Sequence, residues 1–206
     1  MSNARPLVCV IITNYNYGHY LDDAINSIKN QTFKDFEIIL IDDCSTDEIS
    51  IKKVEKLKDD PQIKVIVNKV NKGVVYSRNH AITHTNCEYV IFVDADDQLE
   101  NTTLQKMHQK TQDYDVISCG YRQFGDRTKV SKNNSFNKYT LCHKAIIHNS
   151  SLFKKSLFEK CGGYNENMNH GFEDHDLWLS MCEAGARFYI LKEPLLRYRI
   201  KIDSRN

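Results

Sequence analysis

The sequence predicts an α/β fold with a mainly parallel central sheet flanked by helices. In the first half of the chain, short apolar runs alternate with segments that have the periodicity of amphipathic helices. The apolar runs are nearly continuous, which is typical of parallel strands covered by helices on both faces. With 206 residues, the chain is long enough for one domain with a buried core.

Four strands and three helices are expected in the first half. The strands are the apolar runs over 7–13, 36–41, 63–67 and 89–93. A helix follows the first strand, and its apolar residues fall on one face: Leu21, Ala24, Ile25 and Ile28. The run Ser45-Thr46-Asp47-Glu48 matches a capping box and predicts a second helix through about Lys58. A third helix is expected over 74–85, after the turn residues 71–73.

The second half is less regular. Helices are expected over 101–112, 156–160 and 173–184, and strands over 115–122, 145–153, 187–191 and 195–200. The segment 125–138 is polar, which favours mobility. There is no internal repeat and no linker, so we expect a single domain over 1–206, with two functional halves that meet near residue 98.

Composition excludes several classes of protein. The formal net charge is +1, whereas a general nucleic-acid binder needs a basic face. No apolar run reaches the length of a membrane span, and the N-terminus lacks a secretory signal. These features predict a cytoplasmic protein, bound at most to the inner face of a membrane. The seven cysteines contain no C-x-x-C pair, which argues against a disulfide framework or a zinc site.

Polar residues follow three of the predicted strands: Thr13-Asn14, Asp42-Asp43 and Asp94-Ala95-Asp96. Because ligands of open α/β sheets bind outside the carboxyl ends of the strands, these residues are expected to gather along one edge. Asp94 and Asp96 can hold a hard divalent cation through oxygen, and the alternative is a turn stabilised by aspartate. A carboxylate of Asp42-Asp43 can accept a hydrogen bond from a base or a ribose, and the alternative is a helix cap.

Two further segments carry chemistry-bearing side chains. Glu173-Asp174-His175-Asp176 opens a predicted helix, where acidic residues suit the helix dipole. A carboxylate there can also project from the helix start as a general base. Arg78 lies in a predicted helix and can meet a phosphate or a base, or lie on a solvated face.

The combination resembles the family 2 inverting glycosyltransferases, which have the GT-A fold. Five strings carry the resemblance in the same order and spacing, from about Leu7 to Ile200: VCVIITNYN (8–16), QTFKDFEIILIDDCSTD (31–47), NKGVVYSRNHAI (71–82), YVIFVDADD (89–97) and GFEDHDLWL (171–179). The resemblance implies the Rossmann-like fold of nucleotide-diphospho-sugar transferases. It also implies a nucleotide-binding half over about 5–98 and an acceptor-binding half over about 99–206.

The resemblance also implies roles for single residues. Thr13 and Tyr15 match positions that flank the nucleotide base, and Asp43 matches the carboxylate that meets uracil. The whole expected nucleotide-sugar-binding set is Thr13, Asn14, Tyr15, Asp42, Asp43, Arg78, Asp94 and Ala95. Asp94 and Asp96 match the D-x-D pair that binds Mn²⁺ or Mg²⁺, with the second aspartate as the direct ligand. Asp174 matches the catalytic base.

The function implied is transfer of a hexosyl or N-acetylhexosaminyl group from a UDP-sugar to a saccharide or lipid-linked saccharide, in surface polysaccharide or glycan assembly. The oligomeric state stays open. In the family, a histidine often follows the final Y-R strand, but here Tyr198-Arg199-Ile200 runs into Lys201 and the sequence stops at Asn206. Two alternatives stay open: the C-terminal lid has been removed, or this member lacks it.

Three other functions are weighed against this one. A sugar nucleotidyltransferase needs a glycine-rich, basic phosphate loop after the first strand, and residues 13–18 have neither feature. A D-x-D phosphatase places its aspartates after the first strand, whereas here they follow the fourth. A non-catalytic module that binds nucleotide sugars, or a pseudo-enzyme, is the remaining alternative.

Overall fold

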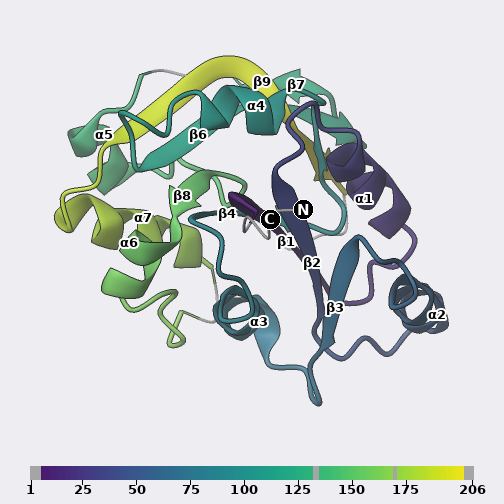
Figure 1. Cartoon of the computed structure of the whole chain (residues 1–206). Helices are drawn as coiled ribbons and strands as arrows, with labels where there is room; N and C mark the ends of the chain where they lie inside the picture. The colour runs from purple at the N-terminus through teal and green to yellow at the C-terminus, as the bar shows by residue number, and fades with distance from the viewer. Residues whose placement is uncertain (1–5, 132–134, 169–170, 202–206) are drawn as a thin grey trace, which may run out of the picture.

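The computed structural model describes residues 6–131, 135–168 and 171–201, and its core is one mixed sheet covered by helices (Figure 1). The strands follow the order β3-β2-β1-β4-β8-β6-β9-β5 across the sheet, and β7 pairs with β6. Four parallel strands form the first part: β1 (Val8–Asn14), β2 (Phe36–Asp42), β3 (Ile63–Val67) and β4 (Tyr89–Asp94). This part confirms the four strands expected from the sequence.

The register of β1 brings the polar strand ends together. Thr13 lies beside Asp94 of β4, and Asn14 lies beside Asp42 of β2. The predicted gathering of these side chains at the carboxyl edge of the sheet is therefore confirmed.

Both faces of β1 are buried, which explains its continuous apolar run. Val8, Val10 and Ile12 pack on the face that carries α1, α2 and α4, and Cys9 and Ile11 pack on the opposite face. The helices of the first face are α1 (Leu21–Lys29), α2 (Glu48–Leu57) and α4 (Thr103–His108). The second face carries α3 (Gly73–Ile82), α5 (Lys138–His143), α6 (Lys155–Lys160) and α7 (Glu173–Glu183). None of the described helices is both long and apolar enough to cross a membrane.

The later strands extend the sheet beyond β4 with one long parallel pairing, between β6 and β9, and several short antiparallel pairings. They are β5 (Gln98–Leu99), β6 (Val116–Gly125), β7 (Lys129–Val130), β8 (Leu152–Lys154) and β9 (Phe188–Ile200). The two terminal strands predicted from the sequence are one strand, β9, which pairs in parallel with β6 across a bulge. Pro194 lies in this bulge, where the missing amide hydrogen costs little. Gly120 faces it, and a Cβ there would lie 2.8 Å from the Glu193 carbonyl oxygen.

Two local predictions are wrong, and one helix was missed. The predicted capping box fails because Asp47 caps α2 through Ser50, whereas the Ser45 hydroxyl donates to Asp42. Of the predicted strand 145–153, only residues 152 and 153 lie in a strand, because β8 pairs with β4 and β6 over two positions each. The polar segment 125–138 contributes β7, and Asn137 caps α5, a helix that the sequence did not predict. Residues 132–134 lie outside the described residues.

Candidate active site

Two adjoining cavities lie at the carboxyl ends of the parallel strands. The first has a volume of about 850 Å³, and eight of the predicted site residues line it: Thr13, Asn14, Tyr15, Asp43, Arg78, Asp94, Ala95 and Asp96. The second has a volume of about 460 Å³ and contains the predicted base, Asp174, in its wall. Arg78, Asp94 and Glu173 line both cavities, so these charged side chains form the wall between them.

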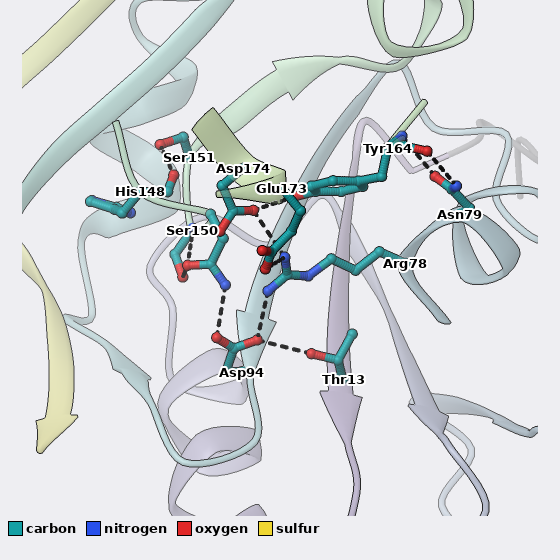
Figure 2. A network of polar contacts seen from close by, with 11 residues as sticks. Thr13, Arg78, Asn79, Asp94, His148, Ser150, Ser151, Tyr164, Glu173 and Asp174 are labelled. Carbon is teal, nitrogen blue, oxygen red and sulfur yellow. Dashed lines mark hydrogen bonds and ion pairs between the residues drawn. The ribbon is translucent and has the colours of Figure 1, made fainter. Parts of the chain in front are cut away.

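Asp94 is held by donors from three parts of the chain. Its Oδ1 atom accepts hydrogen bonds from the Thr13 hydroxyl at 2.9 Å and from Arg78 at 3.1 Å. Its Oδ2 atom accepts one from the Asn149 amide at 2.9 Å. Figure 2 shows these contacts converging on one carboxylate. Because both of its oxygens accept hydrogen bonds, Asp94 joins Thr13, Arg78 and Asn149 in the wall of the site.

Arg78 is the buried cation of this wall. Its side chain is 3% exposed, and its guanidinium lies 3.1 Å from Asp94, 2.9 Å from Asp174 and 3.5 Å from Glu173. Burial acts to lower the pKa of Arg78, but the surrounding carboxylates and Tyr164 outweigh burial and leave that pKa well above its ordinary value. The arginine is therefore charged and links carboxylates from both halves of the chain (Figure 2).

Asp174 lies in the first turn of α7 and uses one oxygen for the protein. Its Oδ1 atom accepts hydrogen bonds from Arg78 at 2.9 Å and from the Tyr164 hydroxyl at 2.7 Å. Within the described part of the chain, its Oδ2 atom accepts no hydrogen bond, and the residue lines the second cavity. Burial raises the pKa of Asp174, while Arg78 and Tyr164 offset part of that rise. A carboxylate of this kind can accept a proton from a group in the second cavity.

Asp96 faces the first cavity, where a cation already contacts it. The Lys201 ammonium lies 2.8 Å from its Oδ2 atom and 3.5 Å from the centre of the Tyr17 ring. The lysine ammonium is a cation bound at this carboxylate, so Asp96 lies beside a position where positive charge is stabilised. In residues 6–131, 135–168 and 171–201, no cluster of three or more His, Cys, Asp or Glu side chains is arranged to hold a metal. Mg²⁺ in proteins is often held by one or two carboxylates together with substrate phosphates and water, and the carboxylate that this cavity offers for such a role is that of Asp96.

The C-terminal strand fixes the loop that carries Asp96. The Arg199 amide donates to Asp97 at 2.8 Å, and the Arg199 side chain donates to the Asp96 carbonyl at 3.0 Å. Burial raises the pKa of Asp97 well above its ordinary value, and Asp94 adds to that rise. The loop after β4 is thus held by a residue about one hundred positions later in the sequence.

Asp42 and Asp43 differ in what they contact. Asp43 lines the first cavity and accepts hydrogen bonds from the Asn68 amide and the Gly73 backbone, both at 2.7 Å. It thereby fixes the start of α3. Asp42 is buried, accepts hydrogen bonds from Asn14 and Ser45 at 2.6 Å, and does not line either cavity. Its role in the structure is to hold Asn14 at the cavity wall.

The sequence profile described as glycosyl transferase family 2 matches residues 9–174 of this chain. The chain belongs to glycosyl transferase family 2. Among its relatives, the GalNAc(5)-diNAcBac-PP-undecaprenol beta-1,3-glucosyltransferase of Campylobacter jejuni is 32% identical, over 91% of this chain and 63% of that protein.

Solved structures show the same fold. S. aureus TarS 1–349 in complex with UDP aligns with a TM-score of 0.77 and 24% identity, over 94% of this chain and 60% of that one. The mannosyltransferase PcManGT from Pyrobaculum calidifontis, in complex with GDP-Man and Mn²⁺, aligns with a TM-score of 0.77 and 20% identity, over 98% of this chain and 59% of that one. The family 2 chain therefore has the GT-A fold and spans about three fifths of these two solved chains.

Sequence reasoning missed several residues that shape this family 2 site. Asn149 falls within the predicted strand 145–153, and Lys201 was considered only as a departure from the family pattern. Tyr164 follows the glycine pair 162–163, just after the helix predicted over 156–160, and no pattern in the sequence marked it. Asn149 lies 55 positions from its partner Asp94, and Lys201 lies still farther from Asp96. Tyr164 reaches Asp174 from a loop. No local periodicity marks residues of this kind.

Proposed function

We propose that this chain is an inverting glycosyltransferase that moves a hexosyl or N-acetylhexosaminyl group from a UDP-sugar to a hydroxyl acceptor. The observation that carries the proposal is the pair of cavities that share the wall of Arg78, Asp94 and Glu173. The donor occupies the first cavity and the acceptor the second, so the reacting atoms meet at this wall. The complexes of the neighbours with UDP and with GDP-Man support a nucleotide-sugar donor.

Asp174 is the proposed general base. The acceptor oxygen forms a bond to the anomeric carbon, and the bond between that carbon and the diphosphate oxygen breaks. The proton of the acceptor hydroxyl passes to the Oδ2 atom of Asp174, a residue that lines the second cavity and whose Oδ1 atom is engaged by Arg78 and Tyr164. Attack from the side opposite the leaving group inverts the anomeric configuration, and a single protein carboxylate acts on the sugar.

Positive charge on the donor side stabilises the departing diphosphate. Asp96 is the proposed direct ligand of Mn²⁺ or Mg²⁺, and Asp94 supports the loop from its hydrogen-bonded position. When bound there, the metal would act as a Lewis acid for the charge that builds on the leaving group. Arg78 holds the wall that faces the same charge.

The second cavity has the character of a saccharide site. Tyr121, Phe172 and Tyr198 line it and offer aromatic surface for a sugar ring. Burial lowers the pKa of His148 to about 4, so this neutral imidazole adds a polar group without charge. The name of the Campylobacter relative contains a saccharide joined through diphosphate to undecaprenol, which supports a saccharide or lipid-linked saccharide acceptor in surface glycan assembly.

UDP with Mn²⁺ should stabilise the folded chain, because a ligand of the native state shifts the unfolding equilibrium. At a UDP concentration of one hundred times Kd, the gain is about 2.7 kcal/mol. Asp96→Ala should abolish the metal-dependent part of the shift, and Asp94→Ala should reduce it less. Melting temperatures measured with UDP, GDP or Mn²⁺ alone, and with each nucleotide together with Mn²⁺, give the size of the shift. Asp22→Ala is the control, because its exposed carboxylate, in the described part of the chain, forms an ion pair with Lys53 and does not line either cavity.

A shift with GDP and none with UDP would contradict the choice of uracil. An unchanged metal-dependent shift in Asp96→Ala would contradict the metal role. A panel of UDP-sugars and GDP-mannose, assayed for metal-dependent hydrolysis beside the melts, separates an enzyme from a module that only binds nucleotide sugars.

A further inference from the structure

A reciprocal pair of hydrogen bonds joins α3 to the loop before α7. The Asn79 side-chain amide donates to the Tyr164 carbonyl at 2.9 Å, and the Tyr164 backbone amide donates to the Asn79 side-chain oxygen at 2.9 Å. Figure 2 shows both bonds beside the polar network of the site. The backbone of Tyr164 is therefore held to the helix that also carries Arg78.

Gly163 permits this close approach. Its φ angle is +77°, in the left-handed region, and a Cβ atom there would lie 2.8 Å from the Asn79 side-chain oxygen. Any side chain at position 163 would therefore push against the Asn79 side chain and disturb its two hydrogen bonds with Tyr164, which we call the Asn79 clamp. Gly162 has a similar φ of +81°, but a Cβ there would meet nothing within 4 Å.

The Tyr164 side chain connects the Asn79 clamp to Asp174. The side chain is 2% exposed and packs among Phe92 and Phe158, so its ring has little freedom. Its hydroxyl donates to the Oδ1 atom of Asp174 at 2.7 Å, which is the oxygen that Arg78 also contacts. Two donors, each anchored through α3, thus converge on one carboxylate oxygen.

We propose that Tyr164, clamped by Asn79, is a positioning residue that orients Asp174 with its Oδ2 atom toward the second cavity. This inference rests on the proposed role of Asp174 as the base. Two donors on Oδ1 fix the rotation of the carboxylate and leave the other oxygen for the acceptor proton. Precise placement of a catalytic group is worth large factors in rate, since a displacement of about 1 Å can cost a hundredfold.

The hydroxyl of Tyr164 also acts on the charge of Asp174. Burial raises the pKa of Asp174, the Arg78 charge lowers it, the Glu173 charge raises it, the Tyr164 hydrogen bond lowers it, and the Asp94 charge raises it. Arg78 and Tyr164 are thus the two contacts that lower this pKa against the rise caused by burial and by the neighbouring carboxylates.

Tyr164→Phe removes the hydroxyl and keeps the ring. We expect turnover of the preferred UDP-sugar to fall roughly tenfold to a hundredfold, with UDP affinity unchanged. The Asp174 carboxyl, followed by ¹³C NMR in protein labelled at aspartate and assigned with Asp174→Asn, should titrate at higher pH in Tyr164→Phe than in the wild type. Tyr89→Phe is the matched control, because the hydroxyl of this buried tyrosine donates to the Thr111 carbonyl, and neither residue lines the two cavities.

An unchanged Asp174 titration in folded Tyr164→Phe overturns the positioning role, whatever the turnover. If the titration moves but Asp174→Asn keeps full turnover, the positioning contact exists and the proposed base is wrong. The two failures are therefore distinguishable.

The glycine pair tests the clamp without touching a functional group. Both Gly162→Ala and Gly163→Ala place alanine at a positive φ, so both pay a similar backbone strain. Only Gly163→Ala meets the Asn79 side chain, and its Cβ would also lie 3.1 Å from the ring of Phe158, which packs against Tyr164. Both contacts disturb the placement of Tyr164, so we expect this variant alone to lower turnover and raise the pH at which Asp174 titrates. Equal effects of the two substitutions in folded protein would contradict the clamp.

Discussion

Replacing Asp174 with asparagine should lower sugar transfer by at least about a hundredfold while UDP affinity changes little, since a general base typically contributes a hundredfold to ten-thousandfold. The amide keeps the size of the side chain and can still accept from Arg78 and Tyr164 through its oxygen. The donor cavity does not include Asp174 in its wall, which is why UDP binding is spared. Turnover with the preferred UDP-sugar and calorimetry with UDP measure the two quantities.

Asp176→Asn is the control for this substitution. Asp176 lies in the same first turn of α7 but lines neither cavity, so it shares the helix-dipole role without the chemistry. Glu173→Gln is a less clean control, because Glu173 contacts Arg78 and lines both cavities. Near-normal turnover in Asp174→Asn beside an inactive Glu173→Gln or Asp176→Asn would move the base to that neighbour. Full turnover in all three would leave the acidic run as a helix start.

Arg78→Met should lower the free energy of unfolding by about 3–5 kcal/mol, the range found when one partner of a buried ion pair is removed. The methionine fills much of the volume but leaves Asp94, Glu173 and Asp174 facing one another without a cation. Their mutual repulsion is relieved when protons bind, so the deficit should shrink as the pH falls. Urea denaturation at pH 5 and pH 8 measures both effects.

Arg187→Met is the matched control for Arg78. Arg187 also contacts a carboxylate, that of Asp115 at 3.1 Å, but its side chain is 56% exposed. An exposed ion pair is worth about 1 kcal/mol or less, so this variant should unfold close to the wild type. A similar small loss in Arg78→Met would show that the buried wall does not depend on its cation.

The first half of the fold was predictable because β1, β2 and β4 are largely buried on both faces and each reads as one apolar run. The edge strand β3 is only partly buried, but its short run of Ile and Val residues is typical of a strand. The alternating faces of β1 show why, since Val10 and Ile11 meet different helices yet both need apolar side chains. Thr13 and Asp94 were predictable as site residues because parallel strands end along a common edge. Arg78 was expected at the site from the family resemblance, since it lies in a helix. The structure brings them together with Asp174 as expected, although their roles stay predictions.

The second half resisted prediction because its pairings are set by distant partners. The strand β8 has three residues, too few for a periodic pattern, and the run 145–151 before it forms cavity wall and loop. The sequence presented Asp43 as an acceptor for a base or a ribose, and it did not reveal that the Asn68 side chain and the backbone amides of Lys72 and Gly73 also donate to this carboxylate. Contacts of this kind depend on the path of a loop, and local propensity does not encode that path.

Because Arg199 fixes the loop after β4 through Asp96 and Asp97, this loop can reach its final conformation only after Arg199 has been synthesised. Asp97 leaves the ribosome 102 residues before Arg199, its partner. At ordinary elongation rates, this separation corresponds to roughly 5–20 s. Throughout that interval the nascent chain carries Asp94, Asp96 and Asp97 without the strand that anchors them. The parallel strands of the first half can therefore form early, but the loop after β4 becomes fixed only when β9, the last strand, joins the sheet.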